Sequence, residues 1–277
     1  MTAAAEKCHT GWRAELSLGF RQAQGRTILA ERSRRGPLAV QRALYPEADL
    51  CHVYLLHPPG GVAGGDLLNI SIQVKDGASA LITTPGATKF YRSVAPRAFV
   101  RQSLKIMAGS LEWLPQENIL FPGAKVGLAT HLELSADAKF IGWEINCLGR
   151  PVIDEPFDPG QAIFESDVVR EGLPLLCERL VINDAIDLAG PAGLRNQPVF
   201  GNFYATISDD TPTEPLAQIT AEFQRPELGI TLVDGLLIAR YLGNSTETAR
   251  RLFETLWQTL RPMILNRNPC VPRIWNT

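Results

Sequence analysis

The feature that most constrains the fold is the alternation of apolar and polar side chains in short segments. Residues 68–74 alternate without a break, and residues 14–20 place Leu16, Leu18 and Phe20 on one face. A period of two predicts half-buried β-strands. Strand signals at this spacing predict packed antiparallel sheets. Shorter strand signals follow at residues 53–56, 80–84, 104–113, 131–134 and 140–145.

A helical pattern is confined to the last quarter of the chain. Residues 213–224 and 244–260 carry apolar side chains at helical spacing, which predicts two amphipathic helices. The second helix has Asn244 or Ser245 as its N-cap, and Pro262 is expected to end it.

A hairpin is predicted between these helices. Residues 230–233 and 236–241 read as strands, and the dipeptide Asp234-Gly235 that joins them is a strong two-residue turn signal.

The overall prediction is a mainly β protein of stacked antiparallel or helically arranged sheets, with two α-helices in the C-terminal quarter. The 23 glycines and 20 prolines are typical of turn-rich β proteins. The β body spans about residues 11–208, and a strand–helix–hairpin–helix unit of about residues 204–262 packs on it. Because no long polar linker separates the two parts, we expect a single domain over residues 1–277.

Charge and cysteine content exclude several classes of protein. Lys and Arg number 27 and Asp and Glu 29, for a net charge of −2, so no strong attraction to nucleic acid or anionic membranes is expected. The five cysteines form no CxxC pair and indicate free thiols rather than a disulfide scaffold or a zinc site. With no apolar run that fits a membrane span or a signal peptide, we expect a cytoplasmic protein.

The densest local motif is HPPGGVAGGD at residues 57–66, which places Gly60, Gly61, Gly64 and Gly65 in one loop. Such a loop serves as a structural turn, as a functional surface loop or as a phosphate cradle. A cradle would need the Lys-Ser/Thr of a P-loop and a following helix, whereas a strand follows here. The structural turn is therefore favoured, with the other two alternatives open.

Two acidic residues stand in apolar surroundings. Glu144 lies inside an alternating apolar run, and Glu178 lies between Cys177 and Arg179. A carboxylate that points inward needs a partner, water or a metal ion; on the exposed face of a strand it needs none. The four histidines have no metal-ligand spacing, and the chain has no GxSxG, HExxH or dinucleotide motif.

Five motifs together resemble one known family. The chain is similar to the UreD (UreH) family of urease accessory proteins, in the family's order and over nearly the whole chain. The motifs are HPPGGVAGGD at residues 57–66, TTPGATKFYRS at 83–93, LEWLPQENILFPGA at 111–124, CLGRPV at 147–152 and PRIWNT at 272–277.

The resemblance implies a chaperone or scaffold for nickel insertion, not an enzyme. Members bind apo-urease and the accessory protein UreF, and through UreF they recruit the GTPase UreG. The implied fold is a helix-like stack of sheets with a pair of helices. No permanent cofactor is implied, because nickel is transient cargo and GTP belongs to the partner.

The resemblance also implies an internal path for nickel. By motif position, Asp66, Glu144 and Glu178 match acids of this path, and Thr88 matches a small hydroxyl residue beside the glycine loop. Leu67 stands where some relatives have a second acid. Single carboxylates along a wet passage hold Ni²⁺ weakly, as a relay requires.

The C-terminal segment offers a further prediction. Arg273 and Trp275 are residue types that anchor protein interfaces, and the alternative is a tail packed on the body. Two other functions stay open: an enzyme that binds a phosphorylated ligand with the loop at residues 60–65, and an adaptor that joins UreF to urease without touching metal.

Overall fold

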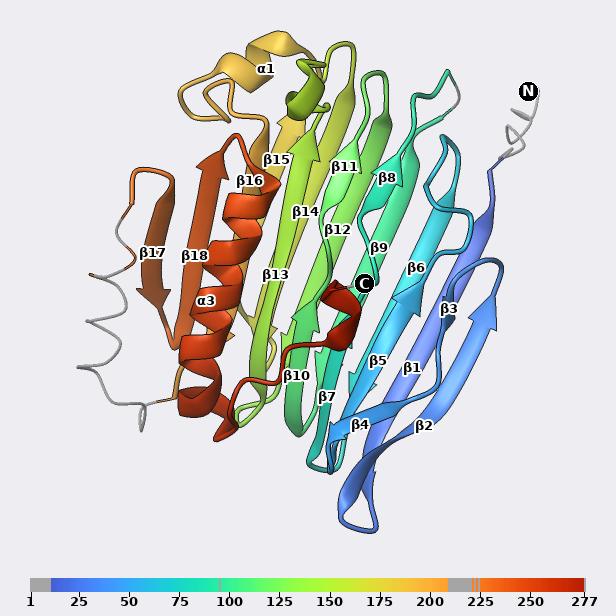
Figure 1. Ribbon diagram of the computed structural model, residues 1–277, viewed down its shortest axis with the longest axis vertical. Helices are drawn as coiled ribbons and strands as arrows, with labels where there is room; N and C mark the ends of the chain where they lie inside the picture. Colours follow the sequence, from blue (N-terminus) through green and yellow to red (C-terminus); the bar gives the residue numbers. More distant parts are fainter. Residues whose placement is uncertain (1–10, 95, 209–220, 222, 224, 277) are drawn as a thin grey trace, which may run out of the picture.

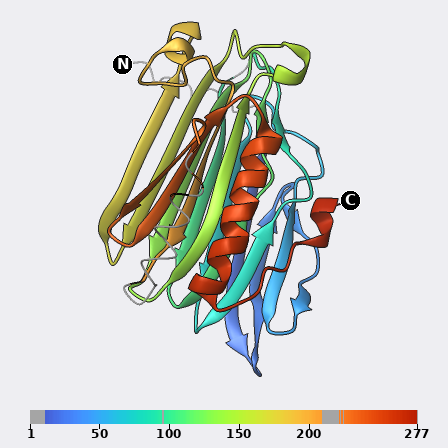
Figure 2. The ribbon, with the colours of Figure 1, turned by 60° about the vertical axis from the view of Figure 1, so that its left-hand side comes forward.

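Two β-sheets face each other across an apolar interior, and one long helix covers the outside of the second sheet (Figures 1 and 2). The computed structural model describes residues 11–94, 96–208, 221, 223 and 225–276. The first sheet has seven strands in the order β15-β14-β12-β9-β6-β1-β2. These strands are β1 (Arg13–Ala23), β2 (Arg26–Arg35), β6 (Leu67–Val74), β9 (Ala98–Ile106), β12 (Lys125–Leu134), β14 (Gln161–Arg170) and β15 (Leu173–Ile182).

The second sheet follows the order β17-β18-β16-β13-β10-β7-β5-β3, with short strands β4, β8 and β11 beside it. Its strands are β3 (Ala39–Val40), β4 (Leu44–Glu47), β5 (Leu50–Leu56), β7 (Ala78–Thr83), β8 (Thr88–Phe90), β10 (Gly109–Leu114), β11 (Asn118–Leu120), β13 (Lys139–Leu148), β16 (Val199–Thr206), β17 (Leu228–Val233) and β18 (Leu236–Gly243). The described helices are η1 (Pro151–Ile153), α1 (Ala185–Ala189), α3 (Thr246–Leu265) and η2 (Arg273–Asn276).

The chain winds between the two sheets like a coil. From β5 to β14 the long strands alternate between the second and the first sheet, and neighbouring coils pair in parallel. The mainly β prediction is confirmed, but the expectation of antiparallel pairing is wrong for this central part. Antiparallel pairs are found toward the ends, between β1 and β2, β14 and β15, and β13 and β16. Alternation reports which face of a strand is buried and not the direction of its neighbour, which explains the error.

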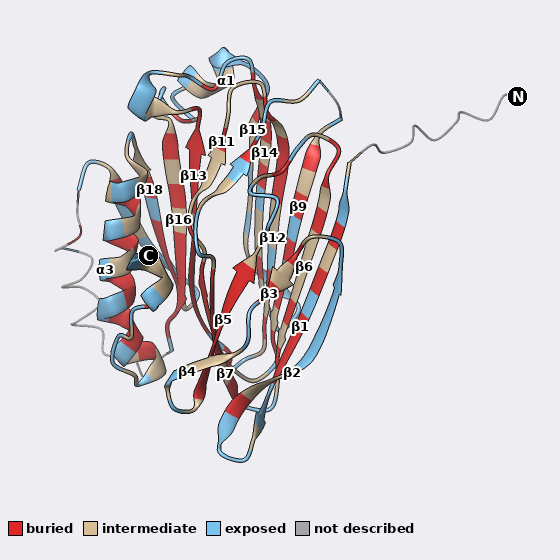
Figure 3. Cartoon of the chain, turned by 45° about the vertical axis from the view of Figure 1, so that its right-hand side comes forward, coloured by how far each residue is buried: buried red, intermediate tan, exposed pale blue. Residues whose placement is uncertain are grey.

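Burial divides the interior into two apolar layers (Figure 3). One layer fills the space between the sheets, and the other lies between the second sheet and α3. Strand β13 contributes to both, with Phe140 facing the first sheet and Trp143 facing α3. This two-sided burial explains why the β13 segment is almost continuously apolar.

Helix α3 confirms the predicted second helix, with one correction at its end. Ser245 is the N-cap, and its side chain accepts a hydrogen bond from the Thr248 amide. The helix does not stop at Pro262 but continues to Leu265. Proline removes only one amide donor, and the buried side chains of Arg261 and Ile264 hold the last turn in place.

The predicted hairpin is also confirmed. Strands β17 and β18 pair antiparallel, and Asp234 and Gly235 both have positive φ angles of 46° and 71°, as a tight turn between twisted strands requires. The other predicted helix, at residues 213–224, falls mostly outside the described residues. No helix in the described part of the chain has the length and apolar character needed to cross a membrane.

Candidate functional site

A row of polar side chains crosses the apolar interior between the sheets. Gln102, Thr130, Ser166 and Glu178 are direct register partners on four neighbouring strands of the first sheet, β9, β12, β14 and β15. For Gln102, Thr130 and Ser166 the neighbours along the strand, two residues away, are buried and apolar, whereas those of Glu178 are apolar and half-buried. Three residues of the second sheet face this row: Glu144, Tyr204 and Arg240. We call these seven residues the polar seam.

Glu144 is the centre of the polar seam. One of its carboxylate oxygens accepts hydrogen bonds from Thr130 Oγ1 at 2.5 Å and from Gln102 Nε2 at 2.8 Å. Burial raises the pKa of Glu144, and the two hydrogen bonds only partly offset this effect. The carboxyl group therefore has one well-held oxygen and one that makes no hydrogen bond within the described protein.

The polar seam borders two cavities, and Glu144 lines both of them. One, of about 260 Å³, extends from Glu144 to the glycine loop at Gly60 and Gly61 and is also lined by Thr88. The other, of about 20 Å³, lies between Glu144, Ser166 and Tyr204. A space of this size holds about one water molecule. The interior is therefore open from the glycine loop to Glu144, and the small cavity beyond it is lined mostly by apolar side chains, with Thr130, Ser166 and Tyr204 among them.

Glu178 closes the far end of the polar seam. Its carboxylate accepts a hydrogen bond from Tyr204 Oη at 3.2 Å and pairs with the guanidinium of Arg240. Arg240 in turn lines a groove of about 920 Å³ at the edge of the sheets. Burial and the nearby Glu178 carboxylate raise the pKa of Tyr204, so its hydroxyl stays protonated and donates to Glu178.

Both carboxylate oxygens of Asp66 are engaged by backbone amides at the glycine loop. They accept hydrogen bonds from the backbone amides of Trp12 at 2.7 Å and Ala63 at 2.9 Å. Asp66 is buried and is not among the residues that line the cavity at Glu144. The structure gives Asp66 the role of holding the glycine loop, and its contact with nickel stays a prediction.

The glycine loop packs closely against residues 89–93. A side chain at Gly61 would collide with Tyr91, and one at Gly64 with Ser93. Gly60 and Gly65 have positive φ angles of 78° and 89°, which favour glycine. The structural-turn alternative therefore accounts for all four glycines.

A phosphate cradle at the glycine loop has little support. The amides of Gly60, Val62, Ala63 and Asp66 already donate to protein acceptors, and strand β6 follows the loop where a cradle needs a helix N-terminus.

The C-terminal tail is packed on the body. The ring of Trp275 lies 5.9 Å from that of Trp143 and 6.0 Å from that of Trp257, centroid to centroid, and its Nε1 donates to Thr83 Oγ1 at 2.8 Å. Of the two alternatives for Trp275, the structure shows the packed tail. Arg273 is exposed, and its binding to a partner stays a prediction.

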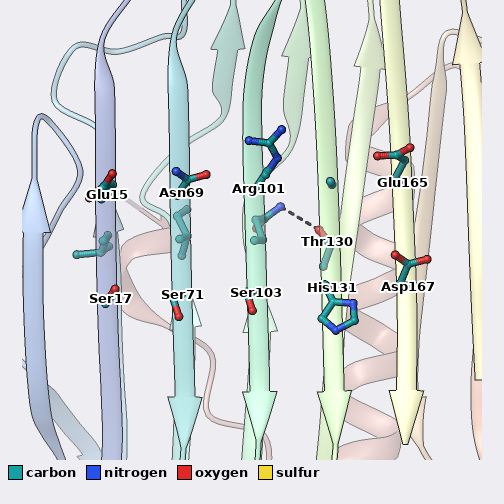
Figure 4. A pocket seen from close by; sticks show the side chains of 14 residues that line it. Glu15, Ser17, Asn69, Ser71, Arg101, Ser103, Thr130, His131, Glu165 and Asp167 are labelled. Atoms are coloured by element: carbon teal, nitrogen blue, oxygen red, sulfur yellow. Dashed lines mark hydrogen bonds between the residues drawn. The ribbon is translucent and has the colours of Figure 1, made fainter. Parts of the chain in front are cut away.

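A second polar surface lies outside the polar seam. The outer face of the first sheet carries a groove of about 490 Å³, lined by rows of side chains that stand on neighbouring strands (Figure 4). Ser17, Ser71, Ser103, His131 and Asp167 form one such row. None of the residues predicted from the sequence to form a site lies in this groove. The groove provides control positions for the experiments below.

The comparison with protein families decides the identity of the chain. The model of the UreD urease accessory protein family matches residues 12–276.

The chain belongs to the UreD family of urease accessory proteins.

Curated relatives match over nearly their whole length. The chain is 48% identical to the urease accessory protein UreD of Alcanivorax borkumensis, over 97% of this chain and 94% of that protein. It is 45% identical to that of Aliivibrio fischeri strain ES114 and 44% identical to that of Escherichia coli, again over 97% of this chain. Urease accessory proteins are assembly factors, so this UreD-family chain is not an enzyme, and a phosphate-dependent enzyme is set aside.

Sequence analysis found part of the polar seam and missed the rest. Glu144 and Glu178 were singled out, whereas Gln102, Thr130 and Ser166 were not. The signal was present, because Gln102 and Thr130 are each the single polar residue in a series of inward positions, such as Val126, Leu128, Thr130, Leu132 and Leu134 in β12, and Ser166 has apolar residues on both sides in its series. A polar residue at an apolar position of one strand is uninformative, but the same break in neighbouring strands marks a polar row.

The raised pKa of Glu144 predicts a pH effect on stability. A carboxyl whose folded pKa lies above its ordinary value of 4.5 lowers stability as pH rises from 4.5 through the folded pKa. Glu144→Gln removes this loss, because an amide does not ionise. We expect the variant to be more stable than the wild type at pH 8 and equally stable at pH 4. Urea denaturation at both values measures the difference; a constant difference would contradict a raised pKa.

Proposed function

We propose that this protein delivers nickel to apo-urease through the polar seam, as part of a cytoplasmic complex in which it binds urease on one side and UreF on the other. UreF in turn recruits the GTPase UreG. Nickel is cargo, and the protein keeps no permanent cofactor. The single observation that carries the proposal is the polar seam from Gln102 through Glu144 to Glu178, set in the mostly apolar layer between the sheets and joined at Glu144 by the cavity that extends to the glycine loop.

The cost of the polar seam supports a functional role. Polar groups in an apolar core lower stability unless every hydrogen bond is made. Glu144 is half-buried in β13, and in the part of the chain that the structure describes only one of its carboxylate oxygens accepts hydrogen bonds. A fold that only needed stability would have no use for a carboxyl group beside two cavities.

The ligand chemistry of the polar seam suits a transient cation. Gln102, Thr130 and Glu144 offer oxygen atoms, which bind borderline divalent ions weakly when they act singly. No group of three or more His, Cys, Asp and Glu side chains suitable for a metal exists among the described residues. An ion that met such a group would be held, whereas a relay requires release.

Glu178 fits the proposed nickel path, but as a weaker binding position than Glu144. Because Arg240 neutralises its carboxylate, a cation at Glu178 must compete with a guanidinium group. Glu178 is therefore a weaker waypoint than Glu144, and nickel leaves more readily from this end of the polar seam. The exposed groove beside Arg240 offers the ion a way out.

Reconstitution tests the proposed function. Purified apo-urease, UreF, UreG, GTP and nickel are combined with and without this protein, and urease activity and complex formation are measured. We expect activation only with the protein present and co-purification of the protein with both urease and UreF. Equal activation without the protein, or failure to bind either partner, would contradict the proposal.

A further inference from the structure

His57 stands at the outer end of the cavity that leads to Glu144. It follows directly after β5 and precedes the glycine loop, and it lines the cavity of about 260 Å³ together with Gly60 and Gly61. Among the described residues that line this cavity, His57 is the only histidine.

The Nε2 atom of His57 is shielded from solvent and has no hydrogen-bond partner in the described protein. A buried polar atom without a partner costs about 1–3 kcal/mol, and such atoms in a folded protein call for an explanation. Burial lowers the pKa of His57, and the Asp66 carboxylate only partly opposes this effect. The ring is therefore neutral at pH 7, and a neutral imidazole is the form that binds metal ions.

The other polar side chains of the cavity are mostly oxygen and amide groups, among them Gln102, Gln116, Asn118 and Glu144, and the exposed Lys89 also lines it. Oxygen donors alone favour hard ions such as Mg²⁺ and Ca²⁺, whereas an imidazole favours borderline ions such as Ni²⁺, Cu²⁺ and Zn²⁺. A path for nickel that had only oxygen donors would admit the far more abundant hard ions.

We propose that His57 is a metal ligand at the mouth of the cavity, where its unpartnered nitrogen selects borderline divalent cations over hard ones before they reach Glu144. This inference rests on the proposed function, because it assigns a selectivity role within the same path. A metal ion held by one imidazole, with water and cavity amides as its other ligands, is bound only transiently, as a relay requires.

The test measures metal binding by tag-free full-length protein. Equilibrium dialysis with ⁶³Ni²⁺ in millimolar Mg²⁺ gives the affinity, and pulsed electron paramagnetic resonance with Cu²⁺ as the probe detects a bound imidazole by its remote nitrogen. For His57→Gln we expect at least about a tenfold loss of ⁶³Ni²⁺ affinity and loss of the imidazole signal.

The remaining histidines supply the controls. His131→Gln changes an exposed histidine of the outer groove, and His9→Gln changes one outside the described residues; both should keep the affinity and the signal. Thermal unfolding verifies that His57→Gln is folded, and His57→Asn serves as a second variant. Unchanged ⁶³Ni²⁺ affinity or a persistent imidazole signal in a folded His57 variant would overturn the inference.

Urease activation separates this inference from the proposed function. If His57→Gln binds nickel like the wild type while Glu144→Leu still blocks activation, His57 is no ligand and the polar seam remains the path. If neither substitution affects activation, the proposed function itself is wrong.

Discussion

Glu112→Ala should lower the free energy of unfolding by about 3–5 kcal/mol, the typical cost of removing one partner from a buried ion pair. Glu112 and Arg261 are both fully buried and join through Arg261 Nε at 2.8 Å and Nη2 at 3.0 Å. Trp257 Nε1 also donates to Glu112, at 2.6 Å. The substitution therefore leaves a guanidinium and an indole N–H with fewer partners inside the protein.

The position of this ion pair explains the size of the expected effect. Glu112 lies on β10 and Arg261 near the end of α3, so the pair joins the helix to the second sheet across the apolar layer. Arg261 also donates to Glu47, which accepts from His52 as well. Burial opposes ionisation of Glu47, but the hydrogen bonds from His52 and Arg261 outweigh it and lower the pKa of that carboxyl.

Chemical denaturation followed by tryptophan fluorescence measures the loss. The matched control is Glu133→Ala, which removes the carboxylate of the partly exposed pair with Lys105 and should cost at most about 1 kcal/mol. Equal effects of the two substitutions would show that the buried pair does not anchor α3.

Glu144→Leu should reduce nickel-dependent activation of urease to the level seen without the protein, while the fold and the complex with partners are preserved. Leucine has a similar size and fits the apolar layer, but it offers no oxygen atom to a cation. It also places an apolar side chain in the lining of both cavities. The substitution thus removes both the ligand and the polar lining at this position in one step.

The readouts are urease activity after reconstitution and co-purification with urease and UreF. Glu133→Leu is the control, because it removes a carboxylate of the same charge from the outer face of β12. Normal activation by a folded Glu144→Leu protein would mean that nickel does not pass Glu144.

The sequence predicted the strands but not the way in which they are joined. The alternation in β1 and β6 shows one buried face, and the hairpin at Asp234-Gly235 could be predicted because its turn residues are adjacent in the chain. The parallel coil could not be predicted from alternation, since β6 and β9 would show the same pattern with either direction of pairing. Strand order depends on contacts between distant residues, which local patterns do not contain.

The candidate site shows the same limit. Glu144 could be singled out because buried residues flank it on both sides, with Trp143 and Ile145 covered by α3. Glu178 gave a weaker signal, since its neighbours in β15 are mostly exposed or half-buried, and the resemblance to the family added its role in the nickel path. Its contact with Arg240 joins residues 62 positions apart, and only the folded arrangement reveals that pair.

The most direct measurement is the amount of ⁶³Ni²⁺ that reaches urease when the polar seam is blocked at either of two points. Glu144→Leu blocks the seam at its centre, and Ser166→Leu fills the small cavity beside Tyr204. After incubation of the complete complex with GTP and ⁶³Ni²⁺, urease is isolated and its label is counted. If nickel passes through the polar seam, both variants should form the complex but leave urease without ⁶³Ni²⁺. Wild-type labelling with either variant would contradict this path.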